Sequence, residues 1–171
     1  PSSFGTYLNE KKDIKELFLS LFGLSQGDKD IVLKELETSM EGKAKTQDDY
    51  YTTEGVISTV LKKYPGDIGC VFPLMMNVVH VAPGEALYLE PDTLHAYVKG
   101  NGMELMTASD NVLRGGLTPK RIDLKELSSL LYFGPSFPEN VKKREKDGII
   151  NYMTPSPDFM LSRMDDGIFN A

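Results

Sequence analysis

The stretch FPLMMNVVHVAPGEALYLEPDTLHAYVKGNGMELM, from Phe72 to Met106, decides the fold of this chain. Its apolar runs are separated by turn residues at Pro83-Gly84, Glu90-Pro91-Asp92 and Gly100-Asn101-Gly102. Short apolar runs between such turns are typical of β-strands, and strands this close in sequence favour antiparallel pairing. We therefore predict an antiparallel sandwich or barrel. Its strands span residues 72–81, 86–89, 94–98 and 103–106.

The residues before this stretch have a helical pattern. Apolar side chains recur there at intervals of three and four residues, which predicts three helices. Gly23, Gly42 and the pair Pro65-Gly66 stand where these helices should end. The three apolar stripes consist of Ile14, Leu17, Phe18, Leu21 and Phe22; of Val32, Leu36 and Met40; and of Val56, Ile57, Val60, Leu61 and Tyr64. Residues 1–64 are predicted to form a small helical assembly.

The residues after the quoted stretch combine one helix with loops and a strand. Asp123 is followed three residues later by Glu126, a capping-box spacing that predicts a helix near residues 124–132. Leu124, Leu127, Leu130 and Leu131 should face inward from this helix. We expect a loop over 134–139, a solvated surface at the mixed charges of 142–146, and a strand over 159–164.

Composition and charge exclude several classes of protein. The chain has 171 residues, 40% hydrophobic and 26% charged, as in an ordinary globular domain. Its formal charge of −6 gives no electrostatic footprint for nucleic acid. Cys70 is the only cysteine, so no intrachain disulfide is possible, and no apolar run approaches the ~18 residues of a membrane span. We expect a cytoplasmic protein with no nucleic-acid or membrane partner.

The two histidines limit what metal chemistry this chain can perform by itself. His80 lies in an apolar run, where a structural role is the more ordinary interpretation. His95 follows a turn and precedes Tyr97 by two residues, so both side chains should project from the same face of a strand. Zinc sites usually take three or four protein ligands, so a site in this chain would need carboxylate or amide partners.

Polar side chains concentrate between residues 95 and 120. His95 and Tyr97 are followed there by Glu104, Asp110, Arg114 and Lys120. Cations of this kind can neutralise a phosphate or a developing enediolate oxygen, a carboxylate can move a proton, and an imidazole can hold a metal. The set suits an anionic sugar, although a polar strand end remains the alternative and the spacing does not identify a reaction.

The amino-acid sequence of this region is specific to one family. HAYVKGNGMELMTASDNVLRGGLTPK, from His95 to Lys120, closely resembles the signature of the type I mannose-6-phosphate isomerases. YPGDIGCVFPLMMNVVHVAPGEALYLEPDTLHAY, which begins at Tyr64, resembles the segment that precedes this signature in the same family. Two small residues depart from the family pattern, since Thr107 and Gly115 stand where alanine is usual. Gly115 should loosen the backbone beside Arg114.

The resemblance implies a fold and a division into domains. It implies a cupin, a double-sheet jelly roll, interrupted by a helical insert. On this basis we expect residues 1–64 to be the helical insert domain. Residues 65–155 would belong to the catalytic cupin domain, and residues 156–171 would begin a C-terminal cupin-like domain.

The resemblance also implies a reaction and a metal. Family members interconvert mannose 6-phosphate and fructose 6-phosphate through a cis-enediol and bind one zinc ion through a glutamine, two histidines and a glutamate. His95 matches the later histidine, Arg114 the catalytic arginine, and Glu104 a pocket carboxylate that is a candidate for proton transfer. Tyr97, Asp110 and Lys120 match further substrate-binding positions. The chain contains no Gln-x-His motif, so the other three zinc ligands are expected outside it.

A lone imidazole binds zinc weakly, so we expect this chain to be inactive by itself. It should be one portion of the enzyme, completed by a missing N-terminal half or by a companion chain. Two alternatives stay open: a metal-free sugar-phosphate-binding cupin or pseudoenzyme, and a purely structural cupin module. Metal content and isomerase activity distinguish the first alternative from an enzyme, and an Arg114→Ala substitution without effect would indicate the second.

Overall fold

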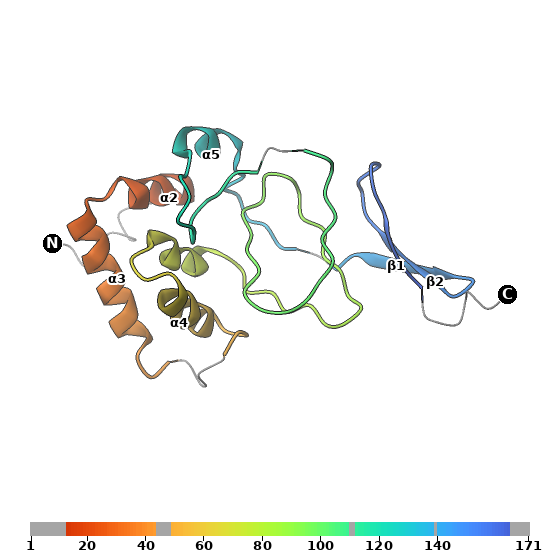
Figure 1. The fold of residues 1–171 in the computed structure, drawn as a ribbon, viewed down its shortest axis with the longest axis horizontal. Coiled ribbons are helices and arrows are strands. Elements are labelled where there is room, and N and C mark those ends of the chain that lie inside the picture. Colours follow the sequence, from red (N-terminus) through yellow and green to blue (C-terminus); the bar gives the residue numbers. More distant parts are fainter. Residues whose placement is uncertain (1–12, 44–48, 110–111, 139, 165–171) are drawn as a thin grey trace. The chain divides into compact units, whose positions relative to one another are not determined.

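The structure, a computed structural model, describes residues 13–43, 49–109, 112–138 and 140–164 (Figure 1). The chain divides into two compact units. The helical unit comprises Pro1–Val79, Asp92–Lys99 and Leu113–Pro135. The sheet unit comprises His80–Pro91, Gly100–Val112 and Ser136–Ala171. Each unit thus draws on segments that are far apart in sequence. The domain boundaries expected after residues 64 and 155 stay predictions.

The three helices that the apolar stripes predict are confirmed. They are α2 (Ile14–Gly23), α3 (Gln26–Met40) and α4 (Thr53–Lys63). Each follows a polar residue, Asp13, Ser25 or Thr52, whose side chain accepts a backbone N–H of the first turn. Such caps satisfy donors that a helix leaves unpaired and stabilise it by about 1 kcal/mol each. Among the described residues, no helix is both long and apolar enough to cross a membrane.

The first predicted strand, over residues 72–81, is wrong. Ile68–Met75 form a 3-10 helix, η1, and the residues that follow, 76–82, join no strand. Asp67 starts η1 by accepting the N–H of Gly69, and the six residues from Ile68 to Pro73 are all buried. A run that is apolar on every side lacks the period that separates a strand from a buried helix. The sequence pattern could not distinguish the two.

One apolar core holds the helical unit together. The ring of Phe18 lies 4.7 Å from that of Phe72 and 5.4 Å from that of Phe133, measured between centroids. Aromatic pairs of this kind contribute about 0.5–1.5 kcal/mol beyond their burial. The buried members of the core are Leu17, Phe18, Leu21, Leu33, Leu36, Val56, Ile57, Val60, Ile68, Cys70, Val71, Phe72 and Leu127.

The fourth predicted helix is present as α5 (Leu124–Leu130). The carboxylate of Asp123 accepts the N–H of Glu126 at 3.1 Å, so the predicted N-cap is confirmed. Leu127 is buried, but Leu130 is 55% exposed, which corrects the expectation that all its leucines face inward. At 100° per residue, Leu130 lies at the margin of the stripe that Leu124, Leu127 and Leu131 form.

The remaining predicted strands of the quoted stretch are nearly absent. Residues 86–89 make one isolated β-bridge, between Leu87 and Asn140. Residues 94–98 and 103–106 join no β-ladder with any part of the chain that the structure describes. A strand must satisfy its backbone groups on a neighbouring strand, and the described residues supply no such neighbour here. The observed architecture is therefore a set of helices and a small antiparallel sheet.

The sheet consists of β1 (Lys142–Lys146), β2 (Ile149–Met153) and β3 (Leu161–Met164), in the order β1-β2-β3 (Figure 1). Asp147 and Gly148 join β1 to β2 and both have positive φ, as a type I′ hairpin turn requires. β3 confirms the predicted C-terminal strand. The charged run of β1 is exposed as expected, but its strand was missed because charged residues give no apolar alternation.

Candidate functional site

Residues 92–99 carry two of the predicted site residues and are fixed to the helical unit by three contacts. The carbonyl of Asp92 accepts the N–H of Tyr132 at 3.1 Å. The side chain of Leu94 packs against the apolar core. At the other end, Lys99 Nζ lies 4.3 Å from the ring centroid of Tyr50, a cation–π contact worth about 0.5–1 kcal/mol. The segment is anchored although it is not a strand.

The imidazole of His95 has a defined orientation. Its Nδ1 lies 2.8 Å from the carbonyl oxygen of Thr93. A carbonyl can only accept, so Nδ1 is the donor of this bond, which leaves Nε2 of the neutral ring as the nitrogen that could bind a metal. The ring of Tyr97 lies 6.2 Å from that of His95, edge to face. The two rings therefore share one side of the segment, as their spacing predicted.

Arg114 lies on a second segment that adjoins the first within the helical unit. Its neighbour Leu113 packs against the core, and Arg114 itself is exposed. Gly115 is buried, and a Cβ placed on it would lie 2.6 Å from Cδ1 of Leu94. Because Leu94 precedes His95 and Gly115 follows Arg114, the two segments lie side by side. The glycine makes room for a packed leucine, and the expectation that it loosens this backbone stays a prediction.

The chain passes from Arg114 to Lys120 through a tight turn. Gly116 and Leu117 have φ values of 145° and 52°. The carboxylate of Asp67 accepts the N–H of Thr118 at 3.0 Å. The amide of Lys120 in turn donates to the hydroxyl of Thr118 at 3.2 Å. Arg114 and Lys120 are both exposed and belong to the same anchored loop.

The predicted site residues that the structure describes fall in two different units. His95, Tyr97, Arg114 and Lys120 belong to the helical unit, whereas Glu104 belongs to the sheet unit, where it is exposed. Asp110 lies outside the described residues. Within the helical unit, the segment of His95, the predicted metal ligand, thus lies beside the loop that carries Arg114.

Metal-ligating groups are sparse in this chain. No group of three or more His, Cys, Asp or Glu side chains within the described ranges could hold a metal ion. His80 is exposed and belongs to the sheet unit, so the two histidines do not share a unit. By its oriented Nε2, His95 is suited to be one ligand of a larger set.

Cys70 is not a nucleophile in this structure. Its side chain is fully buried, and its thiol donates to the carbonyl of Tyr64 at 3.4 Å. Burial, and then the negative charge of Asp67, raises the pKa of Cys70 to about 12. A thiol with so high a pKa is almost entirely protonated at neutral pH and reacts slowly. Its role is to pack in the core.

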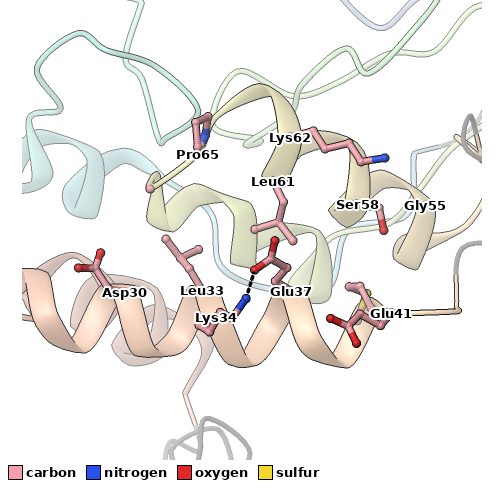
Figure 2. Close-up of a pocket in the computed structure, with 12 residues that line it drawn as sticks. Asp30, Leu33, Lys34, Glu37, Glu41, Gly55, Ser58, Leu61, Lys62 and Pro65 are labelled. Atoms are coloured by element: carbon pink, nitrogen blue, oxygen red, sulfur yellow. Dashed lines mark hydrogen bonds and ion pairs between the residues drawn. The ribbon is translucent and has the colours of Figure 1, made fainter.

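A hollow of about 560 Å³ lies between α3 and α4 (Figure 2). The ion pair of Lys34 with Glu37, 2.8 Å long, joins two side chains of α3 at the edge of the hollow, and this hydrogen-bonded pair raises the pKa of Lys34. No predicted site residue lines the hollow. Its lining residues are Asp30, Leu33, Lys34, Glu37, Met40, Glu41, Gly55, Ser58, Leu61, Lys62, Pro65 and Gly66.

Comparisons with known proteins support one family. No family model matches the chain. A curated relative, the mannose-6-phosphate isomerase of Salmonella typhimurium, is 41% identical over 122 residues, which cover 71% of this chain and 30% of the relative. A crystal structure of a zinc-bound mannose 6-phosphate isomerase covers 87% of this chain with a TM-score of 0.75 and 33% identity. The predicted resemblance to the mannose-6-phosphate isomerases is confirmed.

The match to the mannose-6-phosphate isomerases is partial in length. The chain spans 25% to 36% of the curated relatives and 37% of the zinc-bound structure. A further solved relative, from Salmonella typhimurium, is described as bound to fructose 6-phosphate and zinc. It matches 86% of this chain and 37% of its own with a TM-score of 0.74 and 33% identity. This chain shares its helices and its small antiparallel sheet with these solved structures.

Asp67, Gly69 and Gly116 were not singled out in the sequence as site residues, yet they connect the mannose-6-phosphate isomerase signature to the helical unit. Asp67 stands at the end of the Tyr-Pro-Gly-Asp break and Gly116 in the Arg-Gly-Gly turn. Positions where two backbones approach closely require glycine. Gly69 and Gly116 could therefore have been recognised in the sequence as candidates for such an approach. Nothing in their spacing, however, indicated that residues 67 and 118 meet.

Proposed function

We propose that this chain is the portion of a zinc-dependent mannose-6-phosphate isomerase that supplies the metal ligand His95 and the arginine Arg114. The observation that carries the proposal is the contact of Leu94 with Gly115, because it sets the two segments side by side within one anchored unit. The reaction would interconvert mannose 6-phosphate and fructose 6-phosphate by moving a proton between C1 and C2 through a cis-enediol.

The chemistry assigns a role to each polar side chain. The exposed guanidinium of Arg114 would stabilise the negative oxygen of the enediolate, a contribution of several kcal/mol when the donor is preorganised. Glu104 is the candidate for proton transfer. Tyr97, Asp110 and Lys120 would bind the substrate, with the ammonium of Lys120 suited to an anionic oxygen.

His95 fits zinc as one ligand among several. Its Nδ1–H donates to the carbonyl of Thr93, the outer hydrogen bond that a zinc-ligating histidine usually makes to fix its ring. When bound, the zinc ion would polarise substrate oxygens and favour the enediolate. The described residues offer no second and third ligand grouped with His95, so the other ligands would come from outside this chain.

The chain alone would be inactive and would act with a missing N-terminal half or a companion chain. Apolar side chains are exposed in residues 103–106, which were predicted to be a strand: Leu105 is 43% exposed and Met106 is 57% exposed. Such segments are suited to pair with further strands, as in the cupin jelly roll that we propose for the complete catalytic domain. The helical insert would be residues 1–64, and residues 156–171 would begin a second cupin-like domain.

A second candidate function is a metal-free protein that binds sugar phosphates. It is favoured by the scarcity of grouped metal ligands within the described ranges. In that case Arg114 and Lys120 would hold the anionic sugar without turnover.

Either function would operate in the cytoplasm without nucleic acid or membrane, in keeping with the acidic composition and the single cysteine.

The test is metal content together with isomerase activity in the longest natural form of the protein. We expect about one zinc ion per chain and conversion of mannose 6-phosphate to fructose 6-phosphate, both lost on prolonged chelation and restored by zinc. Binding of mannose 6-phosphate without zinc and without conversion would instead establish the metal-free alternative. The 171-residue chain by itself should show neither stoichiometric zinc nor turnover.

A further inference from the structure

We propose that Asp67 is a positioning residue for the loop that carries Arg114 and Lys120. This inference rests on the proposed isomerase function and extends it to a carboxylate that lies at the start of η1. Asp67 would not touch the substrate. It would act by fixing the backbone from which two cations project.

Both carboxylate oxygens of Asp67 are engaged with backbone donors. Oδ1 accepts the N–H of Gly69 at 2.7 Å, and Oδ2 accepts the N–H of Thr118 at 3.0 Å. The first bond is local and starts η1. The second joins residues 51 positions apart in sequence. Hydrogen bonds to a charged acceptor are about twice as strong as neutral ones, so this carboxylate ties the loop firmly to η1.

The backbones of η1 and the loop approach too closely for side chains between them. A Cβ on Gly69 would lie 2.9 Å from the amide nitrogen of Leu117 and 3.2 Å from Cα of Gly116. A Cβ on Gly116 would lie 3.0 Å from Cε2 of Phe72. The two glycines therefore permit the approach that the bond from Thr118 to Asp67 requires.

The loop itself adopts a conformation that needs support. Leu117 has a φ of 52°, which non-glycine residues rarely adopt, and it follows Gly116 with a φ of 145°. The bond from Asp67 holds the residue directly after Leu117. Thr118 stands four residues after Arg114 and two before Lys120, and its hydroxyl accepts the amide of Lys120. One carboxylate thus holds the turn between the two cations.

Positioning matters for the proposed role of Arg114. A preorganised cation stabilises a developing enediolate only when it already stands where the charge appears, and displacement by about 1 Å can cost on the order of a hundredfold in rate. An aspartate that merely stabilised the fold would lower the melting temperature and leave Arg114 as effective as before. The two roles predict different kinetics.

The variant that separates these roles is Asp67→Asn, made in the longest natural form of the protein loaded with zinc. Asparagine keeps the shape but offers one acceptor oxygen in place of two, so its NH₂ group must face a backbone N–H. We expect kcat to fall about tenfold. With Arg114→Ala already present, the same change should lower kcat by less than about twofold, because the guanidinium to be positioned is gone and a displaced Lys120, a proposed substrate-binding residue, would raise KM instead.

The matched control is Asp13→Asn. Asp13 also accepts two backbone N–H groups, those of Lys15 and Glu16, but both are local to the start of α2. Asparagine is a good N-cap, so kcat should stay within about twofold of the unsubstituted protein. If Asp67→Asn does not fold, Asp67→Ser takes its place, since serine still caps η1 locally but is too short to reach Thr118.

Equal loss of kcat on both the unsubstituted and the Arg114→Ala background, or no loss on either, would overturn the positioning role while leaving the isomerase assignment intact. If the unsubstituted zinc-loaded protein does not isomerise mannose 6-phosphate, the proposed function fails instead. Amide hydrogen exchange then decides the positioning role independently. The Thr118 amide should be protected in the unsubstituted protein and lose about tenfold of that protection in Asp67→Asn, and unchanged protection would refute the clamp.

Discussion

The helices of the helical unit and the strand-like segment of residues 103–106 differ in the burial of their apolar side chains. Leu21 of α2 and Ile57 of α4 are fully buried, whereas Leu105 and Met106 are 43% and 57% exposed. A helix satisfies its backbone within its own segment and needs a partner only for one face. A strand needs a second strand for its backbone as well. Part of a protein can therefore complete its helices while its strands await neighbours.

The same difference separates the two halves of the proposed chemistry. Arg114 and His95 stand on segments anchored to a finished core, so the positions of their backbones are settled within this chain. The proposed zinc site would need ligands from outside this chain, so the position of the metal would not be settled within it. The comparison predicts that the helical unit folds in this chain alone and that catalysis appears only in the complete protein.

The largest expected effect concerns Arg114 in the complete protein. Arg114→Ala should lower kcat a hundredfold or more, about 3 kcal/mol of transition-state stabilisation, while zinc stays bound. The measurement is steady-state kinetics with metal analysis of the same sample. Arg121→Ala is the control, since Arg121 is also exposed, lies seven residues further on, and has no assigned role. Near-normal turnover in the Arg114 variant would refute the role given to it.

The comparison itself is tested by removing one leucine from each region. In this 171-residue chain, Leu21→Ala should lower the free energy of unfolding by about 3 kcal/mol, since the side chain is fully buried. Leu105→Ala should change it by less than about 0.5 kcal/mol, since that leucine is 43% exposed. Urea denaturation measures both.

In the complete protein the second effect should change. If residues 103–106 pair with further strands there, Leu105→Ala should cost about 2 kcal/mol, while the cost of Leu21→Ala stays the same. Equal and small costs of Leu105→Ala in both forms would contradict the idea that this segment acquires a partner.

The sequence was sufficient for the helices and for the family, and insufficient for the contacts between segments. The apolar stripes of α2 and α4 are local patterns, and so is the Asp123 cap of α5. The run from Ile68 to Pro73 is apolar on all sides, so its pattern did not reveal a 3-10 helix. The bond from Thr118 to Asp67 spans 51 residues and leaves no trace in local spacing. The candidate site was predicted as residue identities, and its anchoring required coordinates.

A smaller effect is expected at the point where the two anchored segments touch. A methyl group on Gly115 would lie 2.6 Å from Cδ1 of Leu94, so Gly115→Ala should force this leucine to move and destabilise the chain by about 1 kcal/mol. With Leu94→Ala present, the methyl group has room and the cost should vanish. A double-mutant cycle by urea denaturation measures this coupling, and strictly additive effects would show that the two residues do not share the space.

The last effect is confined to alkaline pH and concerns Cys70 in the finished core. The pKa of its thiol is about 12 in the folded chain against 9.0 for an exposed thiol. Between these values the unfolded chain has released a proton that the folded chain still holds, so the stability contribution present below pH 9 is lost as the pH rises toward 12. The free energy of unfolding should therefore fall more steeply above pH 9 in the unsubstituted chain than in Cys70→Ala. Parallel curves would mean that the thiol is not shielded from solvent. Alkylation at pH 8 checks the same point: a buried thiol reacts only after unfolding. An unshielded thiol would react as fast in the native chain as in urea.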